Sequence, residues 1–344
     1  MNRHSLMLLA FLVFVSLVGL SWTGTFSTYT QLVIMFMGVN IIMSSSLNLV
    51  NGYMGEFSCG HAGFMALGAY TSSLLTVWFF TKGSVFGPNL LPPEWSVWVF
   101  PFTLLAGGVV AALAGLMVAI PSFRTRGDYL AIITLAANYI VKSAIENIQT
   151  IGGARGFMGM SRVVNEMKNV LDIPWMMIWT WIFVFLTLGV IHRFVSSTYG
   201  KGIIAIREDE IAAEIMGVNT RRAKMAAFML SSGMAGVAGG LIAHILGYIN
   251  PGSFTIMKST EALVMVYLGG MGSLSGSVLS AILFTLMLEV LRPLQVIKWV
   301  VVPLILFLLM MFRTEGLLGQ REITDVFPRL KRIFKSREET HGAV

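Results

Sequence analysis

The feature of this sequence that most limits its fold is a series of long apolar runs. An α-helix needs about 20 apolar residues to cross the roughly 30 Å of a bilayer's hydrocarbon core. Only 12% of the 344 residues are charged, which is about half of what a soluble domain carries. We therefore expect an all-α polytopic membrane protein with about ten transmembrane helices, at roughly 6–22, 30–50, 62–80, 97–120, 128–147, 174–192, 224–247, 258–270, 276–291 and 299–312.

The distribution of lysine and arginine predicts how these helices are threaded. These residues concentrate in the cytoplasmic loops of membrane proteins. With the N-terminus inside, 16 of them fall on the cytoplasmic side and 7 on the other, while Lys142 lies within a span. We therefore expect both termini in the cytoplasm, a transmembrane domain over 1–312 and a basic cytoplasmic tail over 313–344. This bias also explains the net charge of +7 without a nucleic-acid partner.

The stretch NGYMGEFSCGHAGFMALGAY, residues 51–70, places three possible metal ligands close together. Glu56, Cys59 and His61 lie within six residues, but the sequence has no second cluster of histidine or cysteine to complement them. A zinc site needs three or four converging ligands. We therefore expect no metal site and no cofactor here.

The glycines of the same stretch predict a broken helix. Asn51, Gly52 and Gly55 favour unwound backbone, whereas Gly60 and Gly63 are small enough to restart a helix that packs closely on others. Unwound backbone at membrane depth is tolerated where it is buried in protein or faces a water-filled cavity. Two interpretations are open: a turn that only packs helices together, or a turn that lines the substrate path.

A second stretch, MGSLSG at 271–276, resembles MGEFSCG at 54–60 and again lies between two apolar runs. On the pathway interpretation, the restarted helix offers free N–H groups to a substrate carboxylate. Glu56 would then accept hydrogen bonds from the substrate's ammonium group.

The fifth apolar run carries a polar stripe. Thr134, Asn138, Lys142 and Glu146 recur every four residues and so share one face of a helix. Ionisable groups inside a membrane are costly and usually face the interior of the bundle or a cavity. The stripe therefore predicts either an interface with a partner subunit or a part of the substrate path.

A loop at about 197–223 carries a short amphipathic pattern. Glu208, Asp209 and Glu210 stand where a helix N-terminus favours anions, and Gly217 ends the helix. The apolar face between them consists of Ile211, Ala212, Ile215 and Met216. A helix of two to three turns here has little core to cover, so we expect it to dock into a groove on another protein. The alternative, a membrane-surface helix, is disfavoured by the acidic residues.

The same loop resembles the EAA motif of ABC importer permeases, whose short helix couples to the ATPase subunits. Ile211-Ala212-Ala213, followed after three residues by Gly217, aligns with the pattern E-A-A-x-x-x-G, and isoleucine replaces the glutamate. The resemblance implies that coupling to the ATPases is carried by Arg207, Glu208, Asp209, Glu210, Ile211, Ala212, Ala213 and Gly217.

Further motifs are similar to those of LivM-type permeases for branched-chain amino acids. Between about residues 40 and 320 they are LNLVNGYMGEFSCGHAGFMALGAY, RTRGDYLAIITLA, AIREDEIAAEIMGVN and GYINPGSFTIMKSTEALVMVYLGGMGSLSGSVLSA. The resemblance implies a type II importer fold with pseudo-repeated halves in a bacterial inner membrane. The partners that it implies are a second permease subunit in a heterodimer, two cytoplasmic ATPases and a periplasmic substrate-binding protein.

The chain contains no G-x-x-x-x-G-K-[ST] phosphate-binding loop, so we expect ATP hydrolysis on a partner and no catalytic residue here. The expected substrates are branched-chain amino acids or, alternatively, urea, amides or another small solute. A secondary transporter is a third possibility, and it would need a titratable carboxylate within the membrane. Its candidates, Asp128 and Glu146, lie near the ends of the fifth run rather than at its middle.

Overall fold

The computed structural model describes residues 26–81, 89–123 and 129–297, together with residue 87 and separate residues in 16–24 and 300–319. Its longer helices are α2 (Thr28–Asn48), α3 (His61–Phe80), α4 (Ser96–Ser122), α5 (Tyr129–Asn147), α7 (Trp175–Ser196) and α10 (Thr220–Leu246). Its shorter helices are α6 (Met160–Val170), α8 (Thr198–Glu208), α9 (Glu210–Ile215), α11 (Ile256–Gly269) and α12 (Leu274–Val290). A π-helical turn, η1 (Leu49–Tyr53), continues α2, and the strands β1 (Phe157–Met158) and β2 (Tyr248–Ile249) pair antiparallel.

Six helices among the described residues are long and apolar enough to cross a membrane. They correspond to the expected spans from 30–50 through 224–247, which confirms a polytopic helical membrane protein. α11 and α12 are shorter, with 14 and 17 residues. The expected spans at 6–22 and 299–312 lie largely outside the described residues, so the total of about ten stays a prediction.

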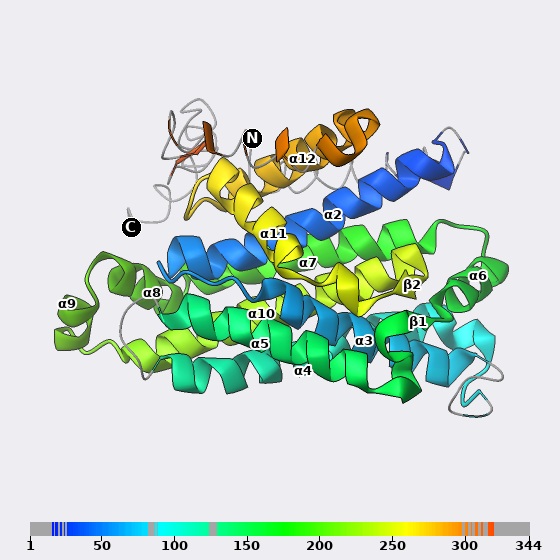
Figure 1. Ribbon diagram of the computed structural model, residues 1–344, viewed down its shortest axis with the longest axis horizontal. Helices are drawn as coiled ribbons and strands as arrows, with labels where there is room; N and C mark the ends of the chain where they lie inside the picture. The colour runs from blue at the N-terminus through cyan, green and yellow to red at the C-terminus, as the bar shows by residue number, and fades with distance from the viewer. Residues whose placement is uncertain are drawn as a thin grey trace, which may run out of the picture.

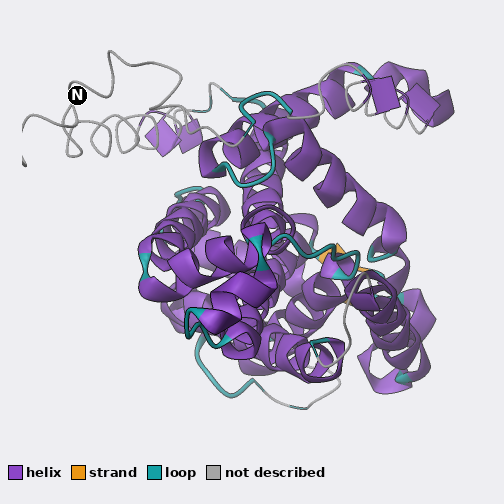
Figure 2. Ribbon diagram, turned by 90° about the vertical axis from the view of Figure 1, so that its left-hand side faces the viewer, coloured by secondary structure: helices purple, strands orange, loops and turns teal. Residues whose placement is uncertain are grey.

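The helices form one bundle with two distinct ends (Figure 1). α10 runs through its middle and packs against α2, α3 and α4, while α2 also packs against α7 and α12. α8 and α9 project at one end of the bundle, and α6 lies with β1 and β2 at the other (Figure 1). We refer to these as the α9 end and the α6 end. Figure 2, viewed from the α9 end, shows several helices nearly end on.

Glycines allow α3, α4 and α10 to approach one another closely. A Cβ atom added to Gly68 would lie 2.1 Å from the Gly236 carbonyl oxygen, and one added to Gly107 would lie 2.7 Å from that of Gly68. A Cβ atom on Gly239 would lie 1.9 Å from the Met65 carbonyl oxygen. Small residues let helix backbones meet in this way in membranes, where the apolar solvent supplies no hydrophobic drive for association. Backbone contact therefore fixes the three-helix centre of the bundle.

The outer face of α4 shows what the bundle presents to lipid. Large apolar side chains along it are exposed, among them Trp98, Phe102, Val109, Leu113 and Met117. Such a face is compatible with hydrocarbon and would be unusual in water. α4 therefore lies at the lipid-facing surface of this chain.

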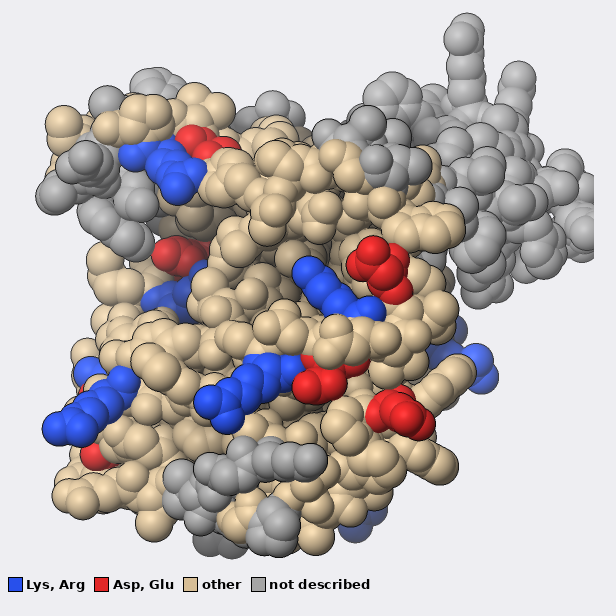
Figure 3. Space-filling view, turned by 90° about the vertical axis from the view of Figure 1, so that its right-hand side faces the viewer, with Lys and Arg blue, Asp and Glu red and all other residues tan. Residues whose placement is uncertain are grey.

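Charged side chains of both signs gather at the α6 end (Figure 3). Lys258 and Glu261 form an ion pair of 2.7 Å within α11. The Tyr248 hydroxyl donates a hydrogen bond of 2.6 Å to the Arg155 carbonyl oxygen. This bond and the β1–β2 pairing attach the glycine-rich loop before α6 to the segment that follows α10.

Candidate functional site

The acidic run 208–210 separates two helices, α8 and α9, where the sequence predicted one helix that begins at this run. Asp209 has extended backbone (φ −157°, ψ 110°), so α8 ends at Glu208 and α9 begins at Glu210. Its carboxylate accepts hydrogen bonds from the Ile211 and Ala212 backbone N–H groups at 2.9 and 3.0 Å. Aspartate at such a position satisfies N–H groups that have no partner within a helix. The expected helix of two to three turns was therefore too long, since α9 has six residues.

α9 exposes an apolar face at its end of the bundle. Ile211, Ile215 and Met216 are 68%, 80% and 83% exposed, whereas Ala213 is buried. Gly217 has φ +84° and ends the helix, and the Val218 N–H donates to the Ala213 carbonyl oxygen at 3.0 Å. Ala213 therefore faces the body of the protein, and the three large side chains form the surface that is open to a partner.

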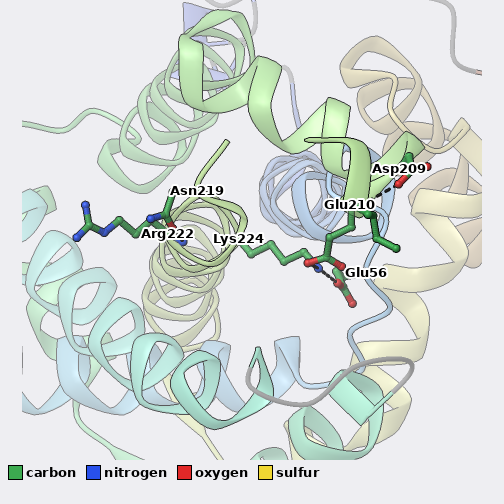
Figure 4. A network of polar contacts seen from close by, with 7 residues as sticks. Glu56, Asp209, Glu210, Asn219, Arg222 and Lys224 are labelled. Atoms are coloured by element: carbon green, nitrogen blue, oxygen red, sulfur yellow. Dashed lines mark hydrogen bonds and ion pairs between the residues drawn. The ribbon is translucent and has the colours of Figure 1, made fainter. Parts of the chain in front are cut away.

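Lys224, in the first turns of α10, connects α9 to the opening of α3 (Figure 4). Its Nζ lies 2.7 Å from Glu56 Oε1 and 2.9 Å from Glu210 Oε1. Its side chain is only 8% exposed, and Nζ also lies 5.9 Å from the centre of the Phe123 ring. Glu56 is thus paired within the chain in this structure, rather than open to a substrate ammonium group.

Arg207, at the end of α8, reaches the first glycine stretch. Its Nη1 donates to the Gly52 carbonyl oxygen at 3.0 Å, and its guanidinium also pairs with Glu208 at 2.6 Å. A Cβ atom on Gly55 would lie 2.6 Å from Arg207 Cγ, and one on Gly272 would lie 3.0 Å from Nη1. The two glycine-containing stretches with similar sequences, 54–60 and 271–276, therefore lie close together beside α8.

Asn48 completes this junction. Its amide donates to the Ser273 carbonyl oxygen at 2.9 Å and to Ser277 Oγ at 2.7 Å, and its Oδ1 accepts from the Gly272 N–H at 3.0 Å. Farther along α2, the Asn40 amide donates to Thr285 Oγ1 at 3.0 Å. Buried side-chain amides thus fasten α2 to the start and the middle of α12.

The backbone breaks between η1 and α3, as Gly55 predicted, and two of the N–H groups beside α3 have partners in other helices. Asn51 and Gly52 lie within the π-helical turn, and irregular backbone follows as far as Gly60. The Cys59 N–H donates to Thr134 Oγ1 of α5 at 3.1 Å, and the Ala62 N–H donates to Ser259 Oγ of α11 at 3.0 Å. In this structure α3 therefore begins with donors that are bound to two neighbouring helices.

The polar stripe of α5 and the glycines of α3 face each other. A Cβ atom on Gly60 would lie 2.4 Å from the Thr134 carbonyl oxygen, and one on Gly63 would lie 2.9 Å from Asn138 Cα. Thr134 and Asn138 are buried in this contact. The rest of the stripe, Lys142 and Glu146, is half-buried and forms an ion pair of 3.6 Å.

The three side chains first considered as metal ligands have separate surroundings. Glu56 pairs with Lys224, and His61 Nε2 lies 3.0 Å from Ser231 Oγ. Burial raises the pKa of the Cys59 thiol above its ordinary value, which disfavours the thiolate needed for metal binding or nucleophilic attack. Their arrangement indicates structural roles.

Residues 29–312 match the family described as the branched-chain amino acid transport system / permease component. The chain belongs to this family. It is therefore a transport permease subunit and not an enzyme. No solved structure matches it.

The curated relatives of the permease include proteins named LivM and LivH. It is 32% identical to the high-affinity branched-chain amino acid permease LivM of Escherichia coli K12, over 90% of this chain and 74% of the relative. It is 25% identical to LivH of the same organism, over 85% of this chain and 96% of the relative. A probable LivM of Methanocaldococcus jannaschii is 24% identical, over 74% of this chain and 79% of the relative. Membership of this family implies an ABC importer with partner subunits.

Sequence reasoning missed Lys224 and Asn48 as parts of the permease's junctions. Lys224 follows Arg221 and Arg222 at the start of α10, where such a group of cations is typical of the cytoplasmic end of a span. Its partner Glu56 is 168 positions away along the chain. The only signal in the sequence was an apolar run of membrane-spanning length that begins with charged residues. This signal does not indicate which residue pairs with Lys224.

Proposed function

We propose that this permease forms part of the path of branched-chain amino acids through a bacterial inner membrane, and that α9 receives the motion of a cytoplasmic ATPase. The observation that carries the proposal is the exposed face of Ile211, Ile215 and Met216 on a six-residue helix. Apolar side chains on so short a helix fit a groove on a partner protein. The complete importer then has a second permease subunit in a heterodimer, two ATPases and a periplasmic binding protein.

The charges of the two ends support an orientation with α9 in the cytoplasm. Residues 193–224, which include α8 and α9, carry six cations and four acids, and Lys201, Arg221 and Arg222 among the cations are exposed. Cationic loops stay on the cytoplasmic side. With this orientation both termini lie in the cytoplasm. The complete fold that we propose has about ten helices in pseudo-repeated halves, as in type II importers.

The outer side of α5 supports its place at the substrate path or at the second permease subunit. Lys142 and Glu146 are half-exposed in the isolated chain, although they belong to an apolar helix. Such groups in a membrane face protein or water rather than lipid. Together with Asn51, Gly52, Gly55, Glu56, Gly60, Gly63, Thr134 and Asn138, they remain our candidates for residues that shape the path.

Replacing Ile215 with aspartate is expected to release the ATPase while leaving the permease folded. A charge in the centre of an apolar contact costs roughly 2 kcal/mol or more, which is about a thirty-fold loss of affinity. The measurement is the amount of ATPase that stays bound to purified permease as the complex is diluted in buffer without added salt. Glu214→Gln on the same helix is the control. Wild-type retention by Ile215→Asp would remove α9 from the docking surface.

Cysteine labelling tests the orientation. In a Cys59→Ser background, Arg155→Cys is expected to react with an impermeant maleimide in intact cells. Arg222→Cys is expected to react only after the membrane is opened, because it lies at the α9 end. If only Arg222→Cys were labelled in intact cells, the topology would be the opposite of the one proposed.

Uptake by the reconstituted importer tests the substrate. With the binding protein encoded or purified beside the permease, leucine, isoleucine and valine are expected to be transported, and urea and acetamide are expected to be excluded. Uptake of urea in place of leucine would keep the permease assignment and change its substrate class.

A further inference from the structure

A single buried cation joins three parts of the permease that are far apart in sequence. Lys224 belongs to α10, Glu210 opens α9, and Glu56 lies in the segment 54–60 that precedes α3; the two carboxylates approach the same ammonium group at 2.7 and 2.9 Å (Figure 4). A lysine with an 8% exposed side chain needs such partners, because an unpaired buried charge is strongly destabilising. The contact is therefore more than a surface ion pair.

The two carboxylates belong to elements that can shift relative to α10. α9 is only six residues long, and Ala213 is its one buried residue. The segment 54–60 has no regular secondary structure, and Gly55 within it has φ +76°. Neither element is held by a long helix of its own, so their mutual position depends on side-chain contacts such as this one.

A displacement of the segment 54–60 would reach the interior of the bundle directly. Cys59 donates to Thr134 of α5, and Ala62, the second residue of α3, donates to Ser259 of α11. The chain of contacts from the exposed face of α9 thus runs through Glu210, Lys224 and Glu56 to the beginning of α3 and to two further helices.

We propose that Lys224 is a positioning residue that transmits the movement of α9 to the segment 54–60. It thereby couples ATP hydrolysis to a movement of the start of α3 relative to α5 and α11. This inference rests on the proposed function, because it takes α9 as the site where the ATPase docks. It separates docking, carried by Ile211, Ile215 and Met216, from transmission, carried by the Glu56–Lys224–Glu210 network.

The test uses the complete importer in liposomes with its binding protein. Two measurements are made on each variant: the amount of ATPase retained on the permease, and the substrate molecules taken up per ATP hydrolysed. Lys224→Gln and Glu56→Gln each break the network at one member. Lys224→Arg keeps the charge, and Lys258→Gln removes an ion pair of the same 2.7 Å length that lies within one helix.

Lys224→Gln and Glu56→Gln are expected to retain the ATPase and to lose roughly five-fold or more in uptake per ATP, as typical coupling between sites implies. Lys224→Arg is expected to restore most of this ratio, and Lys258→Gln to leave it unchanged. Glu56 is partly exposed, so we expect Glu56→Gln to fold even if Lys224→Gln does not. Glu56→Gln then tests the inference by itself.

An unchanged uptake-to-ATP ratio in Glu56→Gln would overturn the inference while leaving the proposed function intact. Loss of the ATPase together with uptake in both glutamine variants would also overturn it, because the network would then only shape the docking surface. A wild-type importer that retains no ATPase would instead refute the proposed function itself.

Discussion

Replacing Gly68 with valine is expected to leave little or no folded permease in the membrane. A side chain at this position meets the backbone of Gly236, whose carbonyl oxygen would be 2.1 Å and whose Cα would be 2.3 Å from the new Cβ. Backbone atoms cannot turn aside as a flexible side chain does, so α3 and α10 must separate. Overpacking usually costs about 1–3 kcal/mol, and we expect a larger loss here.

The measurement is the yield of monodisperse permease after detergent extraction, together with its thermal midpoint. Gly189→Val is the matched control, because Gly189 lies in α7 and a Cβ atom there has nothing within 4 Å. Equal yields and midpoints for the two variants would show that α3 and α10 do not depend on close contact at Gly68.

Replacing Gly55 with valine is expected to lower uptake at least ten-fold, on the order of 1.4 kcal/mol in coupling or more. Gly55 has φ +76°, a conformation that costs a β-branched residue about 1–3 kcal/mol. The new Cβ would also lie 2.6 Å from Arg207 Cγ. Arg207 would then move away from the Gly52 carbonyl oxygen, and the junction of the two glycine stretches with α8 would open.

His61→Gln is the comparison for this variant, since glutamine can keep the hydrogen bond to Ser231. Near-normal uptake by His61→Gln with loss in Gly55→Val would indicate that backbone shape, not histidine chemistry, is what the stretch contributes. Protein level and ATPase retention are measured in both. Normal uptake by Gly55→Val would contradict the proposal that the backbone of this stretch shapes the substrate path. A stoichiometric metal ion that is lost in His61→Gln would contradict it as well.

Local patterns in the sequence predicted most helices closely, because membrane length and glycine placement act over short distances. The expected span 62–80 is the helix His61–Phe80, and the expected span 97–120 is the helix Ser96–Ser122. The expected helix around 208–217 was wrong in length because Asp209 serves as a cap rather than as an acidic residue of the first turn. A cap and a first turn prefer the same residue types, so sequence alone does not separate them.

The contacts between elements followed less from the sequence. The period of Thr134 and Asn138 identified a buried face of α5, but it did not indicate that Gly60 and Gly63 pack on that face. Two of the N–H groups expected to be free at the start of α3, those of Cys59 and Ala62, are bound by Thr134 and Ser259, whose hydroxyls lie in other helices. Side-chain partners of this kind depend on tertiary arrangement, which a single sequence does not specify.

The amide of Asn48 has a consequence for how the permease is made. Its partners in α12 follow it by 225 and 229 residues along the chain. A ribosome adds about 5–20 residues per second, so α2 waits on the order of 10–45 seconds in the bilayer for the groups that satisfy this amide. A chain that stops before α12 keeps Asn48 and Asn40 without these partners inside an apolar helix. Such a chain differs chemically from a finished one, because it carries two amides in an apolar helix that have not yet met their partners.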